Sequence, residues 1–531
     1  TEIYTLSLHD ALPISIGLNP AGGAVAGYSQ FSITPSLSIS ATKAQGYASD
    51  GLDPLGFGDK VSSGYTRFKM PNVGFSINMD TGRRHGLKRV TLGFVSNSTN
   101  DYTYKMGAAG TFFGTHSYSG SLASLANGYT EAQLAPKTSD DWFADGPAWE
   151  AMAGYMSGII DYMGDNTYLG LTDVMVGGIP EAAAELYQQY GHQAKGYKQD
   201  MVFNVSTNFN DKLYLGLNLG VTALSYTEAE YWLEKPDNAS TFPKIEYDGG
   251  KVATFNSLLA KRAYGVSGSG IYLKAGVLWR PVAGLRLGAA IQTPTLVNMT
   301  GRCTWYGETN LSGISFSPSK SPEDEWIYSL RMPFRWNAGL AYSFGSFAVV
   351  SVDYEMADYS HARYRSRSEF GYSDGGWGEQ NADIQDALGL GHNIRAGMEF
   401  KPIPELALRV GYNFLSGAQK NWLVWDNTDP ANPVLYLERL TSKERASQAS
   451  QIVSFGAGYS FGAFYTDLAV RLRFRPDSYY TPYHHYEPGA SVYDKLAADY
   501  IEKAGNTEKI VPEVLVTSKG IDAVLTLGWR F

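Results

Sequence analysis

The chain has 531 residues, a formal net charge of −9 and a single cysteine, Cys303. This charge balance gives no basic footprint for nucleic acid, and a lone cysteine excludes an intramolecular disulfide framework. Aromatic residues make up 14% of the chain and charged residues only 18%, below the roughly 25% of soluble domains, and no run of about 18 apolar residues could form a transmembrane helix.

The N-terminal segment, residues 1–15, reads TEIYTLSLHDALPIS. It lacks the basic start of a secretory signal peptide, because no Lys or Arg precedes Lys43, and Glu2, His9 and Asp10 interrupt its apolar runs. The segment resembles the in-frame translation of a sequencing adapter. We therefore exclude it from fold reasoning and expect that the native N-terminus, with its signal peptide, is missing from this chain.

Residues 16–30 contain the stretch GLNPAGGAVAG and precede the first expected strand. Pro20 fixes its own φ and biases Asn19 away from helical geometry, while the side chain of Asn19 can hydrogen-bond to nearby backbone. The neighbouring glycines permit a close approach to other backbone. From these residue types alone, Asn19, Pro20 and Ala21 form either a packed structural motif or an ordinary turn.

Period-two alternation of apolar and polar residues is the dominant pattern of the rest of the chain. The last segment is the clearest, because Leu525, Leu527, Trp529 and Phe531 share one face and Asp522 lies on the other. Fourteen such segments are expected as strands, near 31–40, 70–79, 88–97, 199–209, 212–223, 269–280, 284–293, 330–344, 346–357, 391–401, 405–415, 449–461, 463–475 and 520–531.

The connections between these segments alternate between short turns and long loops, of which 98–198 is the longest. An even strand number with short periplasmic turns and long outer loops is typical of outer-membrane barrels. The expected fold class is therefore all-β, a transmembrane antiparallel β-barrel of about fourteen strands with both chain ends in the periplasm. The other expected loops are 41–69, 224–268, 294–329, 358–390, 416–448 and 476–519.

The loop 98–198 carries a helical pattern between Pro147 and Met163, and a second short helix is expected over 180–190. Met-rich faces adapt to variable apolar partners, so the first face either binds ligand or packs on the barrel mouth. Its apolar stripe consists of Trp149, Met152, Ala153, Met156, Ile159, Ile160 and Met163.

Charged residues recur on the face of the strands that is expected to point inward. An inward arginine suits a ligand carboxylate because its planar guanidinium donates two hydrogen bonds. Alternatively, the inward charges pair with one another in a charge ladder. The basic members are Lys274, Arg286, Arg335, Arg395, Arg409, Arg471 and Arg473, and the acidic members are Asp353, Glu355, Glu399 and Asp467.

Two neighbouring histidines, His484 and His485, lie among tyrosines in the last outer loop. Paired histidines can ligate metal or haem iron, yet adjacent residues of an extended chain point in opposite directions. An aromatic loop near the membrane surface is the alternative interpretation. We expect no metal, no cofactor and no catalytic residues, because no nucleophile cluster or phosphate-binding loop is found.

The Asn19-Pro20-Ala21 motif, placed directly before the first of fourteen strands, resembles the FadL/TodX family of outer-membrane transporters for hydrophobic compounds. The resemblance implies a truncated hatch at residues 16–30 inside a barrel of residues 31–531. It also implies substrate capture by helical outer loops and a lateral opening at a distortion of the third strand. Here that opening is expected at Ser96, Asn97, Ser98, Thr99 and Asn100.

The expected function is passive uptake of hydrophobic small molecules, such as long-chain fatty acids or aromatic hydrocarbons, across the outer membrane of a Gram-negative cell. The alternatives are a porin for polar solutes, or a surface adhesin or receptor that acts through its long loops. Expected partners are outer-membrane lipid, lipopolysaccharide and the barrel-assembly machinery, which would read the C-terminal Phe531. The protein is expected to be a monomer without enzymatic activity.

Overall fold

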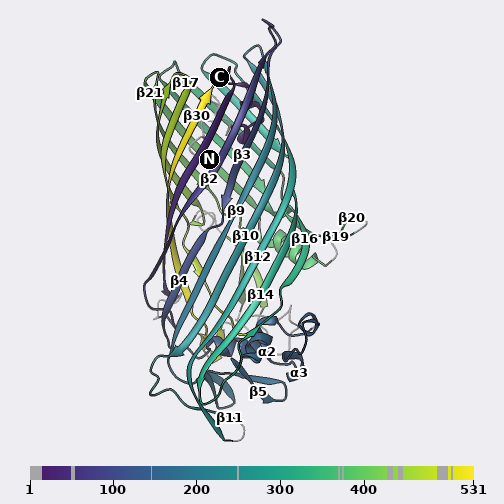
Figure 1. Cartoon of the computed structure of the whole chain (residues 1–531), viewed down its shortest axis with the longest axis vertical. Helices are drawn as coiled ribbons and strands as arrows, with labels where there is room; N and C mark the ends of the chain where they lie inside the picture. Colours follow the sequence, from purple (N-terminus) through teal and green to yellow (C-terminus); the bar gives the residue numbers. More distant parts are fainter. Residues whose placement is uncertain are drawn as a thin grey trace.

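A computed structural model shows the protein as one closed barrel with a cap at one end and a short segment inside it (Figure 1). The adapter-like residues 1–14 lie outside the described part of the chain. The structure describes residues 15–48, 54–144, 146–247, 250–368, 371–373, 376–426, 434–440, 447–486, 500–503 and 506–531.

The barrel wall consists, in the described residues, of fourteen antiparallel strands, which confirms the expected fold class. It closes because β1 pairs with both β2 and the C-terminal β30. The wall strands are β1 (Gln30–Tyr47), β2 (Val61–Asp80), β3 (Leu87–Asp101), β9 (Leu186–Phe209), β10 (Leu213–Pro236), β12 (Lys251–Trp279), β13 (Leu285–Gln292), β17 (Arg335–Phe344), β18 (Ala348–Asp358), β21 (Leu390–Ile403), β22 (Leu406–Leu415), β25 (Ser450–Phe461), β26 (Phe464–Phe474) and β30 (Glu513–Arg530).

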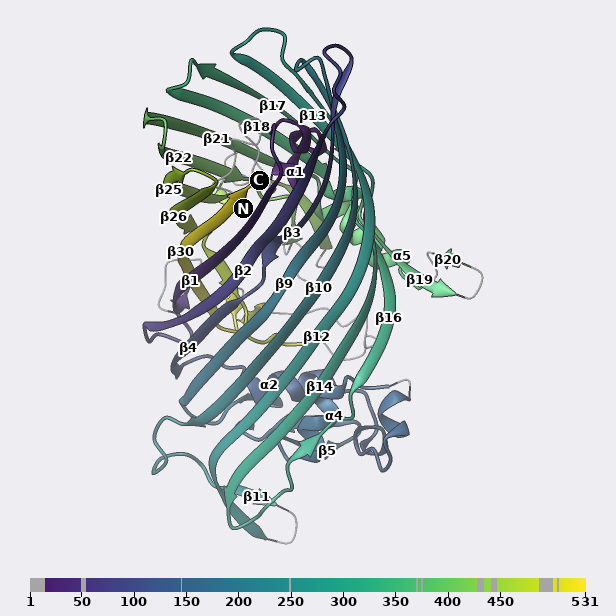
Figure 2. The ribbon, with the colours of Figure 1, turned by 45° about the horizontal axis from the view of Figure 1, so that its top comes forward.

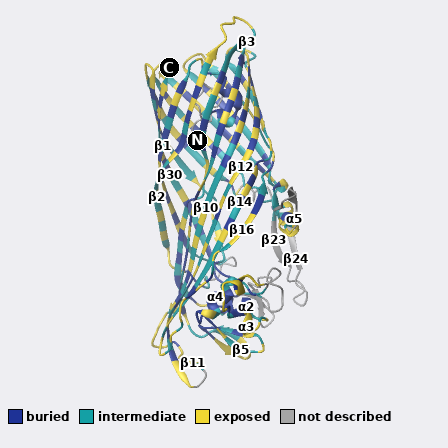
Figure 3. Ribbon diagram, turned by 45° about the vertical axis from the view of Figure 1, so that its right-hand side comes forward, coloured by how far each residue is buried: buried dark blue, intermediate teal, exposed yellow. Residues whose placement is uncertain are grey.

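Exposed apolar side chains form a belt on the outside of the wall. The belt lies towards the end of the barrel at which β30 ends (Figures 1 and 3). On β10 the exposed residues Leu215, Leu217 and Leu219 alternate with inward-facing residues, as the sequence pattern predicts. Aromatic rings stack at the belt's edge, where Phe464 and Trp529 lie 6.2 Å apart. An apolar outer belt edged by aromatic residues is the surface of an outer-membrane barrel.

No helix in the described residues has the length and hydropathy needed to cross a membrane.

One side of the barrel is much taller than expected, because β9, β10 and β12 contain 24, 24 and 29 residues. The expected strands 199–209, 212–223 and 269–280 are only their membrane-level parts, and the prediction of a loop at 224–268 is wrong. Beyond the belt the outward residues are polar, for example Ser225 and Thr227. Alternation of hydropathy therefore stops where lipid stops, although the strand continues.

Three consecutive wall strands are interrupted partway up. After β13 the chain continues as β14 (Leu296–Ser312), β16 (Asp324–Arg331) leads into β17, and β19 (Arg363–Ser368) follows β18. The first two interruptions contain Pro294 and Pro333, which cannot donate to a ladder. The expectation of a loop at 294–329 and an unbroken strand at 330–344 is thus wrong.

The cap is built from the insertion between β3 and β9. Helix α2 (Tyr118–Ala126) is its centre, with every residue buried. Helix α4 (Trp149–Met156) is shorter than the predicted 147–163, because the chain turns at Gly158, whose φ is +74°, into β5 (Ile160–Gly164). The helix expected at 180–190 is wrong, since β8 (Ile179–Ala182) and the start of β9 occupy it.

The remaining elements are short. They are α1 (Ser15–Leu18), η2 (Pro20–Ala24), β4 (Tyr104–Phe112), α3 (Glu131–Leu134), η3 (Asp140–Phe143), β6 (Thr167–Gly170), β7 (Asp173–Val176), β11 (Ile245–Tyr247), β15 (Ser319–Lys320), η4 (Tyr359–His361), β20 (Gly371–Ser373), α5 (Gly378–Ala387), β23 (Asn421–Asp426), β24 (Val434–Arg439), β27 (Ser478–Tyr480), β28 (Tyr500–Lys503) and β29 (Asn506–Lys509).

Candidate functional site

The first described elements, α1 and η2, lie inside the barrel near the end at which β30 ends (Figure 2). Asn19 caps η2, because its Oδ1 accepts a hydrogen bond from the backbone N–H of Ala21 at 3.0 Å. Its Nδ2 donates to the carbonyl oxygens of Val277 and Ala289, at 3.2 and 3.4 Å, on two adjacent wall strands. The segment is thus held as a plug, which we call the hatch.

Wall side chains complete the attachment by donating to backbone carbonyls of the hatch. Asn218 donates to Ile16 at 2.8 Å, Asn204 to Pro20 at 2.9 Å, and Asn337 to Leu18 at 3.2 Å. Lys274 donates to Gly17 at 3.1 Å. These inward-facing groups replace the water that buried carbonyls would otherwise need.

Glycines in the wall make room for the motif. A Cβ atom added at Gly216 would lie 2.2 Å from the carbonyl carbon of Pro20, and one at Gly276 would lie 2.2 Å from Oδ1 of Asn19. Both distances are far below van der Waals contact, so only glycine fits at these wall positions. The Asn-Pro-Ala motif and the two glycines are therefore complementary surfaces.

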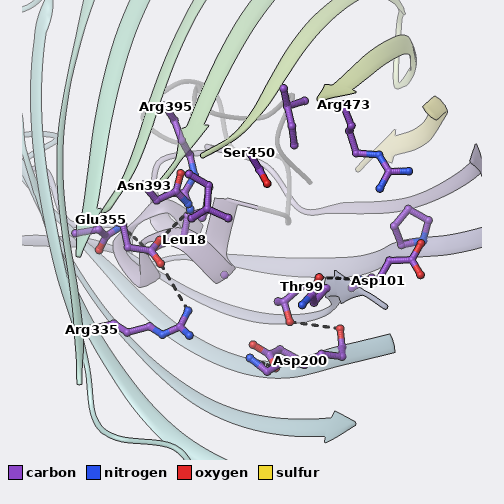
Figure 4. Close-up of a pocket in the computed structure, with 18 of the residues that line it drawn as sticks. Leu18, Thr99, Asp101, Asp200, Arg335, Glu355, Asn393, Arg395, Ser450 and Arg473 are labelled. Atoms are coloured by element: carbon purple, nitrogen blue, oxygen red, sulfur yellow. Dashed lines mark hydrogen bonds and ion pairs between the residues drawn. The ribbon is translucent and has the colours of Figure 1, made fainter. Parts of the chain in front are cut away.

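A cavity of about 600 Å³ lies directly above the hatch, lined by Leu18 of the hatch and by residues of the wall strands (Figure 4). Its lining is strongly basic, with eight cationic and four anionic side chains. The cationic residues are Lys69, Lys198, Lys274, Arg335, Arg395, Arg471, Arg473 and Arg475, and the anionic residues are Asp101, Asp200, Glu355 and Asp522.

Ion pairs organise this lining into two groups that leave positive charge in excess. Glu355 lies 2.9 Å from Arg395 and 3.7 Å from Arg335 (Figure 4). On the opposite side, Asp522 lies 3.1 Å from Arg471 and 3.0 Å from Arg473. Each carboxylate faces two guanidinium groups, so each group retains donors for an anionic ligand.

Four of the six arginines expected on the inward face line the cavity; Arg286 does not, and neither does Arg409. Its guanidinium is paired with Glu399 at 2.7 Å and with Asp467 at closer range. Arg409 belongs to a charge ladder in the wall, which is the alternative that the sequence left open. The cavity also contains Lys69, Asp101, Lys198 and Asp200, which the sequence analysis did not select.

The residues predicted to form a lateral opening lie at a seam between β2 and β3. The ladder between these strands ends at the pair Asn72 and Asn97, and the β3 register against β9 shifts between Ser98 and Asn100. Ser98, Thr99 and Asn100 line the cavity. The chain then turns inward as β4, whose Lys105 carbonyl accepts a hydrogen bond from Thr42 at 2.6 Å.

Above this seam, side chains of β2 rather than a backbone ladder connect β2 to the segment that follows β3. Lys69 pairs with Asp101, the hydroxyl of Tyr65 donates to the carbonyl of Thr103 at 2.7 Å, and Arg67 donates to the Thr103 hydroxyl at 2.6 Å. On the lipid side of β2, Phe68 remains 68% exposed beside the seam. The cavity and the membrane are therefore separated here by side-chain contacts rather than by a backbone ladder.

The apolar stripe of the cap is divided by the fold. Met152, Ile159 and Ile160 are buried in the core of the cap. Trp149 is half-buried and its ring lies 5.6 Å from that of Trp142. Met156 and Met163 are exposed by 40% and 53%. The prediction that the stripe forms one helical face is wrong, because α4 ends at Met156 and Ile159, Ile160 and Met163 lie beyond it.

The paired histidines of the last outer loop do not act together. The ring of His485 lies 4.0 Å from that of His116, whereas His484 contacts Ser121 through its carbonyl. Burial lowers the pKa of His116 to about 4, and burial together with that neighbour lowers the pKa of His485 to about 3. Both rings are neutral at neutral pH. No group of three potential metal-ligating side chains is found in the described residues.

A buried carboxylate anchors the centre of the cap. Asp173 accepts a hydrogen bond of 2.7 Å from Ser117, the residue that caps α2. Burial raises the pKa of Asp173 to about 8, and the nearby Glu234 adds to the shift. Thr172 donates to Glu234 at 3.2 Å and thereby links the two acids.

No protein-family model and no curated protein sequence matches the chain. Its structure is similar to that of a Pseudomonas aeruginosa FadL homologue, at 12% identity and a TM-score of 0.47, over 97% of this chain and 94% of that one. It is also similar to the Ralstonia pickettii toluene transporter TbuX, at 14% identity, a TM-score of 0.44 and coverage of 98% and 94%. The P. putida toluene transporter TodX is similar at 14% identity and a TM-score of 0.43, over 97% of this chain and 92% of that one. The resemblance stated from the sequence thus has a structural match across nearly the whole chain.

Proposed function

We propose that the protein is a passive outer-membrane channel for hydrophobic small molecules that carry an anionic head group, such as long-chain fatty acids. The basic excess in the cavity above the hatch is the observation that carries this proposal. A guanidinium pair suits a carboxylate because it offers parallel donors at fixed geometry. Similar structures described as toluene transporters support the hydrophobic class.

The hatch argues against an open porin, because it occupies the lumen and is bonded to several wall strands. A solute that reaches the cavity therefore needs an exit other than the barrel axis. The seam at Ser98 to Asn100 would offer one, because these residues line the cavity and the ladder between β2 and β3 ends beside them. An apolar tail gains about 25 cal/mol per Å² on passing from water into lipid, which favours this sideways exit.

Capture would begin at the cap. Met156 and Met163 present exposed apolar surface on the cap, and Trp149 is half-buried. Flexible thioether side chains suit ligands of varied shape. In this scheme the buried Met152, Ile159 and Ile160 support the capture surface from beneath.

The test of the lateral exit is uptake of radiolabelled oleate by cells that lack their own fatty-acid transporter and express this protein. Thr99→Trp fills the seam with a large side chain and is expected to reduce the uptake rate at least about tenfold. Thr227→Trp, at an exposed outward position on β10, is the matched control and is expected to leave uptake unchanged. Equal uptake by Thr99→Trp and wild type would refute the lateral exit.

A further inference from the structure

The wall contains a second seam, far from the first in the strand order. The ladder between β18 and β21 ends at the pair Asp358 and Leu390. Beyond this point β19 pairs with β16 on one edge and with β20 on the other. No ladder between β19 and β21 is found in the described residues. The neighbouring interruptions at Pro294 and Pro333 separate β14 and β16 from the membrane-level strands β13 and β17, and β14 remains paired with β12.

Helix α5 bridges this seam through side chains. On one side, Asn381 accepts from the N–H of Tyr364 at 2.7 Å and donates to its carbonyl at 3.0 Å, which fixes the helix to β19. On the other side, Asn421 donates to the carbonyl of Asp386 at 2.6 Å. Asn381 is the buried residue of α5, whose remaining surface is polar and largely exposed. Lys420 also donates to the carbonyl of Gln385 at 2.5 Å and, through its backbone N–H, to that of Ala387 at 2.8 Å, so the bonds of Asn381 are part of a larger set that holds the bridge.

An aromatic cluster lines the inner side of the wall at this seam. Its members are Tyr226, Tyr264, Trp326, Tyr328, Tyr364 and Trp377. The rings of Tyr364 and Trp377 stack at 5.1 Å, and both lie within 5.7 Å of Tyr328. The cluster stands on the buried apolar side chains Val266, Val297 and Met299, and most of its rings are only half-buried.

The cluster is continuous with the central cavity. Tyr102 and Met332 both line the cavity, and Tyr102 contacts the ring of Tyr226 edge-on at 5.8 Å, while Met332 packs against the cluster. Glu228, which Tyr226 contacts, is already paired with Arg262. The cluster thus offers flat rings and aliphatic groups rather than free charge, in contrast to the basic cavity beside it.

The second seam lies close to aromatic rings of the wall, which place it relative to the membrane. Trp336 and Tyr354 contact each other at 5.4 Å, and Tyr354 stacks on His392 at 5.9 Å. These rings lie on adjacent wall strands, within four residues of the end of the ladder at Asp358. Aromatic rings of this kind mark the membrane–water interface of a barrel. The second seam therefore begins at the outer boundary of the apolar belt.

We propose that the aromatic cluster is a second ligand site, selective for neutral, flat, apolar molecules, and that the seam under α5 admits them from the outer leaflet. The inference rests on the proposed function in that both concern passage of apolar solutes through one lumen. The two sites differ in chemistry, because ring faces bind ring faces by stacking and dispersion, whereas the cavity binds anions. An apolar solute dissolved in the leaflet would reach the cluster without crossing the buried cap.

The ligand site can be tested by quenching of tryptophan fluorescence with bromobenzene, using the full chain in nanodiscs. We expect a saturable component that Tyr328→Ala weakens about tenfold, because the site loses a ring face for stacking and apolar area. Replacing the reporter residues Trp326 and Trp377 by Phe should abolish the component. Trp279→Phe, an exposed ring at the other end of β12, should leave it intact. A saturable component that survives the double replacement, or its absence from wild type, would overturn the proposal.

The access route is tested in the same samples with Asn381→Ala, which removes both bonds to Tyr364 and should speed bromobenzene association severalfold. Gln380→Ala, an exposed neighbour on α5, is the matched control. Equal association rates in the three proteins would refute access through the seam. Binding of laurate, measured in parallel, reports on the basic cavity, so failure of the proposed function would appear as lost laurate binding in wild type regardless of the bromobenzene result.

Discussion

The side-chain amide of Asn19 donates to the carbonyl oxygen of Val277 across 3.2 Å, which ties the hatch directly to the backbone of the wall. This contact is possible because Gly276 presents no side chain there. Gly276→Ala would place a Cβ 2.2 Å from Oδ1 of Asn19 and should dislodge the hatch. We expect single-channel conductance in planar bilayers to rise from nearly closed to that of an open pore.

The control for this prediction is Gly265→Ala, where the nearest neighbours of the added Cβ lie 3.8 Å away. Conductance should then stay low. Heat-modifiable migration on gels would verify that both barrels are folded. A closed Gly276→Ala channel would show that the motif does not plug the lumen.

The basic cavity should discriminate between ligands by charge. The triple variant Arg335→Gln, Arg395→Gln and Glu355→Gln neutralises one of the two ion-paired groups of the cavity. Glu355 is replaced together with its two partners because a buried carboxylate without a partner would destabilise the barrel. Charge-assisted hydrogen bonds are worth about 1.5–3 kcal/mol, so laurate affinity should fall at least about tenfold. Dodecanol affinity, measured by the same competition assay, should not change; a parallel loss for both ligands would mean that the group acts through structure alone.

Arg409 should matter for stability and not for binding. Arg409→Leu leaves Glu399 and Asp467 buried without their shared partner, and breaking such a pair costs about 3–5 kcal/mol. The temperature at which the barrel loses its folded gel mobility should fall clearly, while laurate affinity at low temperature stays that of wild type. Unchanged thermal stability would contradict the assignment of Arg409 to a structural ladder.

The sequence predicted the barrel at membrane level because lipid imposes a strict alternation on every wall strand there. It failed above the belt, where water on the outside no longer requires apolar residues, so that β10 beyond Ala223 was predicted as a loop. Lys198 lies one residue before the expected strand 199–209 and Asp200 lies within it, and both continue the inward face of β9. Following every second residue of the inward face to the strand end and beyond would have identified both side chains.

Other parts of the site could not be derived from local pattern. That Arg409 pairs within the wall while Arg395 faces the cavity depends on neighbours from distant strands, such as Asp467. The bridge of α5 likewise depends on Asn381 meeting the backbone of β19. Periodicity assigns a residue to a face, whereas its partners are set by strand register.

The cap should loosen as the pH rises through about 8, because burial raises the pKa of Asp173 to about that value. The folded cap holds this proton more tightly than the unfolded chain does. The stabilisation is therefore complete below the ordinary pKa of an aspartate, near 4, and is lost as the pH rises through about 8. Hydrogen exchange in α2, corrected for the intrinsic effect of pH, should accelerate between pH 7 and pH 9.

The variant Asp173→Asn keeps the acceptor for Ser117 and removes the charge. Its α2 should remain protected at pH 9, with corrected exchange rates close to those at pH 7. The imidazoles of His116 and His485 stay neutral over this range, since burial lowers the pKa of each. Acceleration of the same size in Asp173→Asn would assign the pH effect to another group.

The most direct test of the central claim is mass spectrometry of small molecules that co-purify with the protein from outer membranes in mild detergent. We expect stoichiometric amounts of an apolar compound with an anionic head, and a clear reduction of that compound in the triple variant of Arg335, Arg395 and Glu355. A lumen that holds only detergent and polar solutes, in wild type and variant alike, would contradict it.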